Sequence, residues 1–161
     1  MTCAYIGLGG NGRRAARDVQ LAAKRLQLLP GARLAAVSSL YTSAPLDCPG
    51  RQARYCNAVV QLQTVLPPGR LFRLLQVAER RIQRRRRRRN APRRIDMDYL
   101  LHGNARLRHP KLTLPHPRMY RRGFVLLPLA DIVGDDFSNI RGAEACINGL
   151  SRCYKQDVRR L

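Results

Sequence analysis

The sequence predicts an α+β fold with a ferredoxin-like core, in which strands and helices follow the order β-α-β-β-α-β, and with additional elements at the C-terminus. Two segments have apolar residues at helical spacing, and apolar or alternating segments flank them. The second and third predicted strands are joined by a short loop, which argues against a parallel sheet. Because the chain has 161 residues and is 45% hydrophobic, we expect a single domain over residues 1–161 with a sizeable core.

The first strand, helix and strand follow directly from the pattern. Residues 3–8 (CAYIGL) are a short apolar run typical of a buried strand. Residues 12–29 place apolar side chains at three- and four-residue spacing, which predicts an amphipathic helix, and the Pro and Gly of residues 30–32 end it. Residues 33–43 are strand-like, and residues 44–50 (APLDCPG) form a loop.

The second half repeats this order. Residues 55–64 alternate between two faces and indicate a strand, and residues 67–82 open with proline and continue as a second amphipathic helix. Residues 94–103 read as the last core strand. Residues 114–133 begin as a proline-rich loop and become a helix, and a final helix is expected after Arg141.

Gly7, Gly9 and Gly12 form a G-x-G-x-x-G pattern between the first strand and helix. A dinucleotide site would also need an acidic residue about 20 positions further on. The strand over residues 33–43 contains no acid. We therefore interpret the glycines as a strand-to-helix turn at which the backbone passes close to another group, and exclude NAD.

The charge is strongly unbalanced, with 31 Lys plus Arg against ten acids and a net charge of +21. Such a charge attracts nucleic acid, acidic membranes or phosphorylated small molecules, or reflects a genome rich in arginine codons. Arginine occupies every position from 84 to 89. Alone, this run is typical of a solvated or nucleic-acid-binding segment. Its place between a helix and an acidic strand also fits a lid over an anionic substrate.

Cysteine usage and hydropathy indicate the compartment. The five cysteines are odd in number and contain no C-x-x-C pair, as expected of free thiols in a reducing environment. The sequence shows no apolar run of membrane-spanning length and no signal-peptide pattern. We expect a cytoplasmic protein without a membrane partner.

Asp96 and Asp98 carry the most informative chemistry. They lie two residues apart on a predicted strand, so both carboxylates project from one face. On spacing alone, two solvated acids balanced by arginine are the simpler interpretation. The neighbouring Arg93 and Arg94 instead favour carboxylates that hold Mg²⁺ together with phosphate oxygens, the groups that phosphoryl transfer requires.

Four further residues have open interpretations. Tyr55 and Asn57 share a strand face and could bind a planar ligand, although Asn57 could equally be structural. His116 lies between two prolines, where surface histidines are commoner than catalytic ones, and Phe124 could belong to the core.

Several motifs together resemble those of the 6-hydroxymethyl-7,8-dihydropterin pyrophosphokinase (2-amino-4-hydroxy-6-hydroxymethyldihydropteridine diphosphokinase) family, from about Ala4 to about Asp131. These motifs are AYIGLGGN (4–11), VSSLYTSAPL (37–46), YCNAVV (55–60), APRRIDMDYLLHG (91–103) and LPHPRMYRRGFVLLPL (114–129).

The resemblance implies an enzyme of folate biosynthesis that transfers pyrophosphate from ATP to the reduced pterin, releases AMP and uses two Mg²⁺ ions. We expect a monomer. It implies that Asp96 and Asp98 hold both ions. The implied pterin-binding residues are Gly9, Ser43, Ala44, Leu46, Tyr55, Asn57, Asp96 and Phe124. The implied ATP-binding residues are Glu79, Arg84, Arg89, Arg93, His116 and Arg122. The implied catalytic residues are Arg84, Arg93, Asp96 and Asp98.

The chain departs from the family pattern around the basic segment. Ala91 stands where the family has glycine, Asn90 where it often has tryptophan, and Gly10 where it has serine. The basic lid is one residue short. These departures leave open a catalytically degenerate homologue. A basic nucleic-acid-binding protein on the same fold is a separate alternative. Nucleic-acid binding through the arginine run is not favoured, because aromatic residues are sparse and no RNA-binding motif is present.

Overall fold

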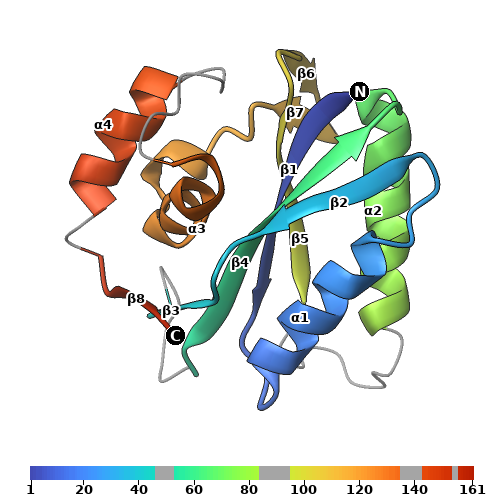
Figure 1. The fold of residues 1–161 in the computed structure, drawn as a ribbon. Coiled ribbons are helices and arrows are strands. Elements are labelled where there is room, and N and C mark those ends of the chain that lie inside the picture. The colour runs from blue at the N-terminus through green and yellow to red at the C-terminus, as the bar shows by residue number, and fades with distance from the viewer. Residues whose placement is uncertain (46–52, 84–94, 135–142, 154–155) are drawn as a thin grey trace.

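The computed structural model describes residues 1–45, 53–83, 95–134, 143–153 and 156–161 (Figure 1). Five strands and two helices occupy the first hundred residues, and a short hairpin, two further helices and a last strand follow among the described residues. The elements are β1 (Thr2–Gly10), α1 (Ala15–Leu26), β2 (Ala32–Val37), β3 (Tyr41–Ser43), β4 (Tyr55–Thr64), α2 (Pro68–Gln83), β5 (Asp96–His102), β6 (Leu107–His109), β7 (Leu112–Leu114), the 3₁₀ turn η1 (Met119–Arg121), α3 (Gly123–Val133), α4 (Ala143–Cys153) and β8 (Val158–Arg160).

The main sheet has the order β5-β1-β4-β3-β8, with β2 also paired to β4 and every pairing antiparallel. The central strands are β1 and β4, and α1 and α2 are the two crossover helices. This arrangement confirms the ferredoxin-like core predicted from the element order. The predicted strand over residues 33–43 is present in two parts. β2 and β3 pair with successive stretches of β4, and residues 38–40 interrupt the pairing.

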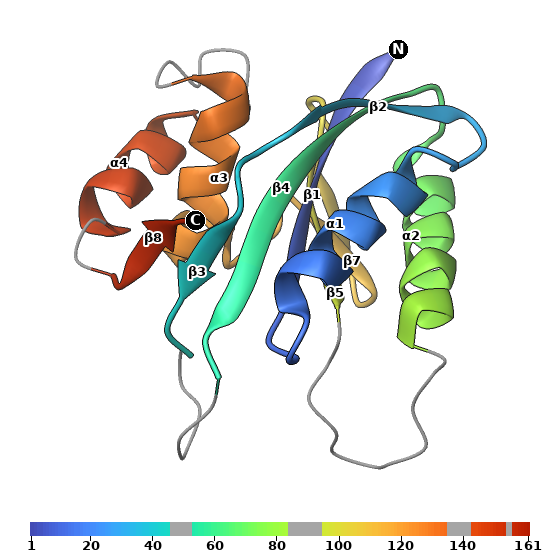
Figure 2. The same ribbon diagram turned by 60° about the horizontal axis from the view of Figure 1, so that its bottom comes forward.

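The layers follow from the two-residue period of the strands. Ala4, Ile6 and Leu8 of β1 pack with α1 and α2, whereas Tyr5 packs with α3 and α4. In Figure 2, α1 and α2 lie on one side of the sheet and α3 and α4 on the other. We call the α1–α2 side the closed face and the α3–α4 side the site face. Burying each large apolar side chain stabilises the fold by roughly 1.5–3 kcal/mol.

Some elements differ from the sequence-based expectations. The β6–β7 hairpin and β8 were not expected, and α1 begins at Ala15 and ends at Leu26 rather than spanning residues 12–29. The expected C-terminal helix is present as α4. Within the described ranges, none of the helices has the length and hydropathy needed to cross a bilayer.

Candidate active site

The strand register brings the two aspartates beside the glycines of β1. Gly9 pairs with Asn57 on one side and with Asp96 on the other, and Gly7 pairs in the same way with Val59 and Asp98. Residues directly opposite one another in a sheet share a face. Val59 packs with apolar side chains of α3 and therefore lies on the site face. Gly7 and Asp98 are on the same face as Val59, and Gly9, Asn57 and Asp96, two positions along each strand, share it. The prediction that the two carboxylates share one face is thereby confirmed.

Gly7 and Gly9 lie inside β1, so their interpretation as turn residues was wrong. A Cβ atom added to Gly9 would lie 3.1 Å from Asn57 Oδ1, closer than ordinary van der Waals contact. The absence of a side chain at Gly9 therefore leaves room between Asn57 and Asp96. The glycine pattern has a physical use, namely to keep the floor of this site free of side chains.

Asn57 and Ser43 form a buried polar pair on the site face. Asn57 is 4% exposed and Ser43 is 3% exposed. Asn57 Nδ2 donates to Ser43 Oγ at 3.0 Å, which fixes the amide with its oxygen towards Gly9. Tyr55 and Ala44 lie half-buried at the neighbouring strand positions. Four of the predicted pterin-binding residues, Gly9, Ser43, Tyr55 and Asn57, are thus on the three adjacent strands β1, β3 and β4, and Ala44 directly follows β3.

Arg122 connects Asp98 to Phe124. It lies in an extended conformation between η1 and α3, and its Nη1 donates to Asp98 Oδ2 at 3.2 Å. Its guanidinium carbon lies 5.5 Å from the centre of the Phe124 ring, a cation–π geometry. Three residues to which the sequence analysis gave different roles therefore form one connected group.

His116 lies next to this group. Its backbone N–H donates to the carbonyl of Leu100 at 2.9 Å, and its Nδ1 accepts from the N–H of Arg118 at 3.2 Å. The neutral ring therefore carries its proton on Nε2. Burial lowers the pKa of His116, Asp98 raises it, and the charges of Arg122 and Arg118 lower it further. The net lowering favours a neutral imidazole beside the carboxylate.

Tyr41 belongs to the same face, although the sequence analysis did not single it out. It pairs with Asn57 across the β3–β4 ladder, and its hydroxyl donates to Asp131 Oδ1 of α3 at 2.8 Å. Burial and the bond to Asp131 raise the pKa of Tyr41 to about 12. The tyrosine stays protonated and fastens α3 to the sheet. The alternation of Tyr41 with Ser43 was the available sequence signal.

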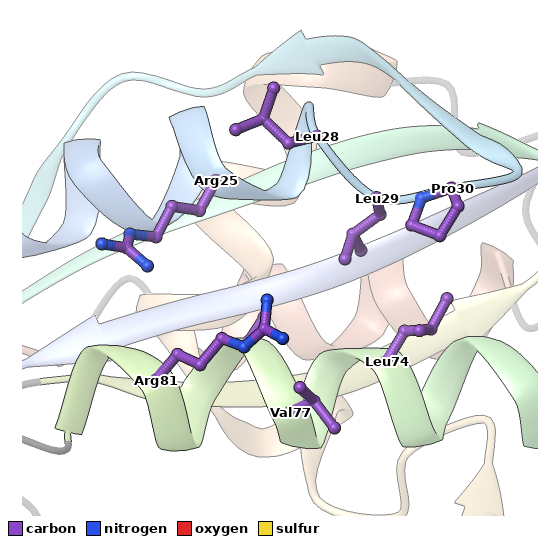
Figure 3. A pocket seen from close by; sticks show the side chains of 8 residues that line it. Arg25, Leu28, Leu29, Pro30, Leu74, Val77 and Arg81 are labelled. Atoms are coloured by element: carbon purple, nitrogen blue, oxygen red, sulfur yellow. The ribbon is translucent and has the colours of Figure 1, made fainter.

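A separate hollow of about 290 Å³ lies between α1 and α2 (Figure 3). Apolar side chains make most of its wall, with Arg25 and Arg81 at its margin. It belongs to the closed face and is lined by none of the predicted site residues, so we do not assign the chemistry to it.

A family model described as 7,8-dihydro-6-hydroxymethylpterin-pyrophosphokinase (HPPK) matches residues 5–134. The chain belongs to the HPPK family. A 2-amino-4-hydroxy-6-hydroxymethyldihydropteridine pyrophosphokinase of Pseudomonas aeruginosa is 43% identical over 131 residues, covering 81% of this chain and 80% of that protein. The enzyme of the same name from Methylorubrum extorquens is 38% identical over 161 residues, covering 100% of this chain and 99% of that protein.

Solved structures support the HPPK fold. The wild-type HPPK-DHPS of Plasmodium falciparum with pteroate superposes with a TM-score of 0.70 and 16% identity, over 96% of this chain and 43% of that one. At this identity the likeness concerns the fold alone.

The other HPPK residues implied by the resemblance are Glu79, Leu46 and three arginines of the basic segment. Glu79 is half-buried near the end of α2, the helix that covers the closed face. The C-terminus of α2 and the first residue of β5 lie at the end of the sheet where Gly9 pairs with Asp96 (Figure 2). Leu46, Arg84, Arg89 and Arg93 lie outside the described residues, as does most of the predicted lid. Residues 80–83 of that segment belong to α2.

The donor set at Asp96 and Asp98 fits Mg²⁺. Within the described part of the chain, no three His, Cys, Asp or Glu residues gather closely enough to form a metal site made of protein alone. Mg²⁺ commonly binds through one or two carboxylates and completes its shell with water and phosphate oxygens. Two half-buried carboxylates on one strand face therefore suit a metal that arrives with a nucleotide.

Proposed function

We propose that this chain catalyses the HPPK reaction on the site face of its sheet. By family it is an ATP-dependent pyrophosphokinase of folate synthesis. In that reaction the pterin hydroxymethyl oxygen bonds to the β-phosphorus of ATP. The bond from that phosphorus to the oxygen bridging the α-phosphate breaks, AMP leaves, and the hydroxyl proton passes to solvent. The placement of Asp96 and Asp98 beside the open floor at Gly9 and Gly7 is the observation that supports this location.

We assign pterin binding to the strands β1, β3 and β4. The carbonyl of the Asn57 side chain is directed towards Gly9, so it suits the N–H groups on the edge of a 2-amino-4-oxopteridine. Tyr55 and Phe124 supply aromatic surfaces, and Arg122 already covers part of Phe124. Ser43, Ala44 and Gly9 line the same region, and Leu46 completes the proposed set.

We assign two magnesium ions to Asp96 and Asp98. When bound, the ions neutralise the negative charge on the phosphates of ATP. The protein's own contribution is to fix both carboxylates at alternate positions of β5, with Asp96 beside Gly9 on the pterin side. Pyrophosphoryl transfer needs this alignment more than it needs a protein nucleophile.

We assign the nucleotide to the cationic groups around Asp98. Arg122 is already at the carboxylate and can donate to a phosphate oxygen, while Nε2–H of neutral His116 offers one further donor. Glu79, Arg84, Arg89 and Arg93 complete the proposed nucleotide site, with Arg84 and Arg93 at the transferring group. The departures from the family pattern at Asn90 and Ala91 bear on the turnover rate.

We also propose that the catalytic unit is a single-domain monomer over residues 1–161 that acts in the cytoplasm. Light scattering with size-exclusion chromatography should give the mass of a single chain, both with and without Mg·ATP.

A coupled assay of AMP release tests the activity. With Mg·ATP and 6-hydroxymethyl-7,8-dihydropterin, AMP should form in step with the pterin pyrophosphate, and omission of Mg²⁺ or pterin should stop it. Calorimetry that shows no nucleotide binding, together with tight duplex or RNA binding at physiological salt, would instead support the nucleic-acid alternative.

A further inference from the structure

The joint between η1 and α3 is held by a side chain from the C-terminal end of the chain. Gln156 Nε2 donates to the carbonyl of Arg121 at 3.0 Å, and Gln156 Oε1 accepts from the N–H of Gly123 at 2.9 Å. These two groups belong to the peptide units on either side of Arg122. One side-chain amide therefore grips both sides of the residue whose guanidinium contacts Asp98.

Local bonds hold the remaining backbone groups of Arg122. Its N–H donates to the carbonyl of Met119 at 3.2 Å, and its own carbonyl accepts from the N–H groups of Val125 and Leu126 at 3.0 Å each. Arg122 offers no side-chain cap to α3, so the oxygen of Gln156 supplies the acceptor that the first N–H of the helix needs. With Gln156 in place, every backbone polar group from the Arg121 carbonyl to the Gly123 N–H has a partner.

The sheet in turn holds Gln156. β8 pairs with β3, with Val158 opposite Ser43 and Arg160 opposite Tyr41. The carbonyl of Asp157 accepts from the N–H of Ala44 at 3.3 Å. Figure 2 shows β8 alongside β3, as the outermost strand of this edge of the sheet. Gln156 therefore bridges two parts of the candidate site, the β3 edge and the Arg122 joint.

We propose that Gln156 is a positioning residue for pyrophosphoryl transfer. By fixing the backbone of Arg122 it keeps the guanidinium at Asp98 and over Phe124, where it can receive the phosphates of ATP. The inference rests on the proposed role of Arg122. It extends the site beyond residues 5–134, the part matched by the HPPK family model, into the C-terminal strand.

Gln156→Met removes both hydrogen bonds and keeps the length of the side chain. We expect kcat to fall about tenfold and KM for ATP to rise, because Arg122 loses its fixed position, while KM for the pterin changes less than twofold. Asp157→Asn is the matched control. This substitution weakens the ion pairs of residue 157 with Arg54 and Arg159 and leaves the hydrogen bonds to Arg121 and Gly123 intact. It should keep kcat within twofold.

A double-mutant cycle separates positioning from general stability. In an Arg122→Ala background, Gln156→Met should change kcat and nucleotide affinity less than twofold, because the residue through which it acts is gone. Equal losses in both backgrounds, or the parent's kcat in Gln156→Met alone, would overturn the inference while leaving the proposed function intact. A parent protein without AMP release would overturn the proposed function, and the inference with it.

Gln156→Glu provides a second readout should Gln156→Met unfold at the assay temperature. Glutamate keeps the acceptor for Gly123 but has no donor for the Arg121 carbonyl. An N-terminal cap for α3 would be at least as good with glutamate, since a negative charge is favourable there. Turnover lower than the parent's at an unchanged melting temperature therefore supports positioning, and parent-like turnover contradicts it.

Discussion

The two faces of the sheet are made from alternate residues of the same strands, yet they have opposite characters. On β1, the closed face receives Ala4, Ile6 and Leu8, all nearly inaccessible to solvent. The site face receives Tyr5 and then Gly7 and Gly9, beside Asp98 and Asp96. The comparison shows that one strand can contribute to the core and to the candidate site at once, because adjacent residues point in opposite directions.

The largest effect is expected at the carboxylates of the site face. Asp96→Asn and Asp98→Asn keep the side-chain shape and remove the charge, so turnover should fall roughly 100-fold or more. The melting temperature in chelator should change little, because half-exposed strand-end acids contribute little packing. Asp157→Asn, an exposed acid in the tail, is the control. Parent-like turnover in both Asp96→Asn and Asp98→Asn would refute the assignment, and unfolding of both would make these acids structural.

Ile6, on the closed face of β1, should show the opposite phenotype, a loss of stability without a loss of binding. Ile6 is 0% exposed in the α1–α2 core, so Ile6→Ala should lower the free energy of unfolding by about 2–5 kcal/mol. KM for ATP and pterin, measured well below the melting temperature, should stay at the parent's values. A large change in KM with unchanged stability would show that the two faces are not separate in function.

Gly9→Ala sharpens the comparison on the same strand. The new methyl group would press on Asn57 Oδ1, at 3.1 Å, in the space assigned to the pterin. We expect KM for the pterin to rise roughly tenfold, as for the loss of one well-placed contact, with KM for ATP nearly unchanged. Gly12→Ala is the control, since no atom lies within 4 Å of a Cβ there. Equal pterin KM values for the two variants would remove Gly9 from the site.

The smallest effect concerns pH. Burial lowers the pKa of His102 and is also the main cause of the lower pKa of His116. A histidine with a lower pKa when folded binds fewer protons than in the unfolded chain. The contribution of these histidines to the free energy of unfolding should therefore be fully present above the ordinary histidine pKa of about 6.5 and be lost as the pH drops below it. Denaturant unfolding at pH 8 and pH 5.5 measures the loss.

His102→Gln should flatten that pH dependence. His102 Nδ1 lies 2.5 Å from the hydroxyl of Tyr99, so the variant also loses some stability at both pH values. The diagnostic quantity is the difference between the two pH values, which should shrink relative to the parent. An unchanged difference would assign the acid sensitivity to other groups.

Long periodic elements could be predicted from the sequence, whereas short ones could not. α2 and β4 span 16 and 10 residues, enough for an apolar period to appear. β6, β7 and β8 have three residues each, and β8 exists because the β3 edge offers it a partner. Gly7 and Gly9 were misplaced because glycine usually marks a turn, and their neighbours across the sheet are invisible in the sequence.

The candidate site was predictable in composition but not in connection. The spacing of Asp96 and Asp98 predicts a shared face, which the register confirms. The contact of Arg122 with Asp98 joins residues 24 positions apart and depends on where α3 begins. Gln156, whose side chain reaches Arg121 from 35 positions away, carries no motif at all. Such long-range contacts arise from tertiary packing, which no local pattern encodes.

The ion pair between Arg122 and Asp98 also bears on the order in which ligands bind. A bare magnesium ion that binds Asp98 must compete with a guanidinium already in place and would leave that guanidinium beside a second cation. Mg·ATP brings phosphate oxygens that accept hydrogen bonds from Arg122 while the metal binds the Asp98 carboxylate. The guanidinium and the magnesium ion therefore each keep an anionic partner throughout the exchange. The free protein should therefore have low affinity for the metal alone, and nucleotide and metal should enter together.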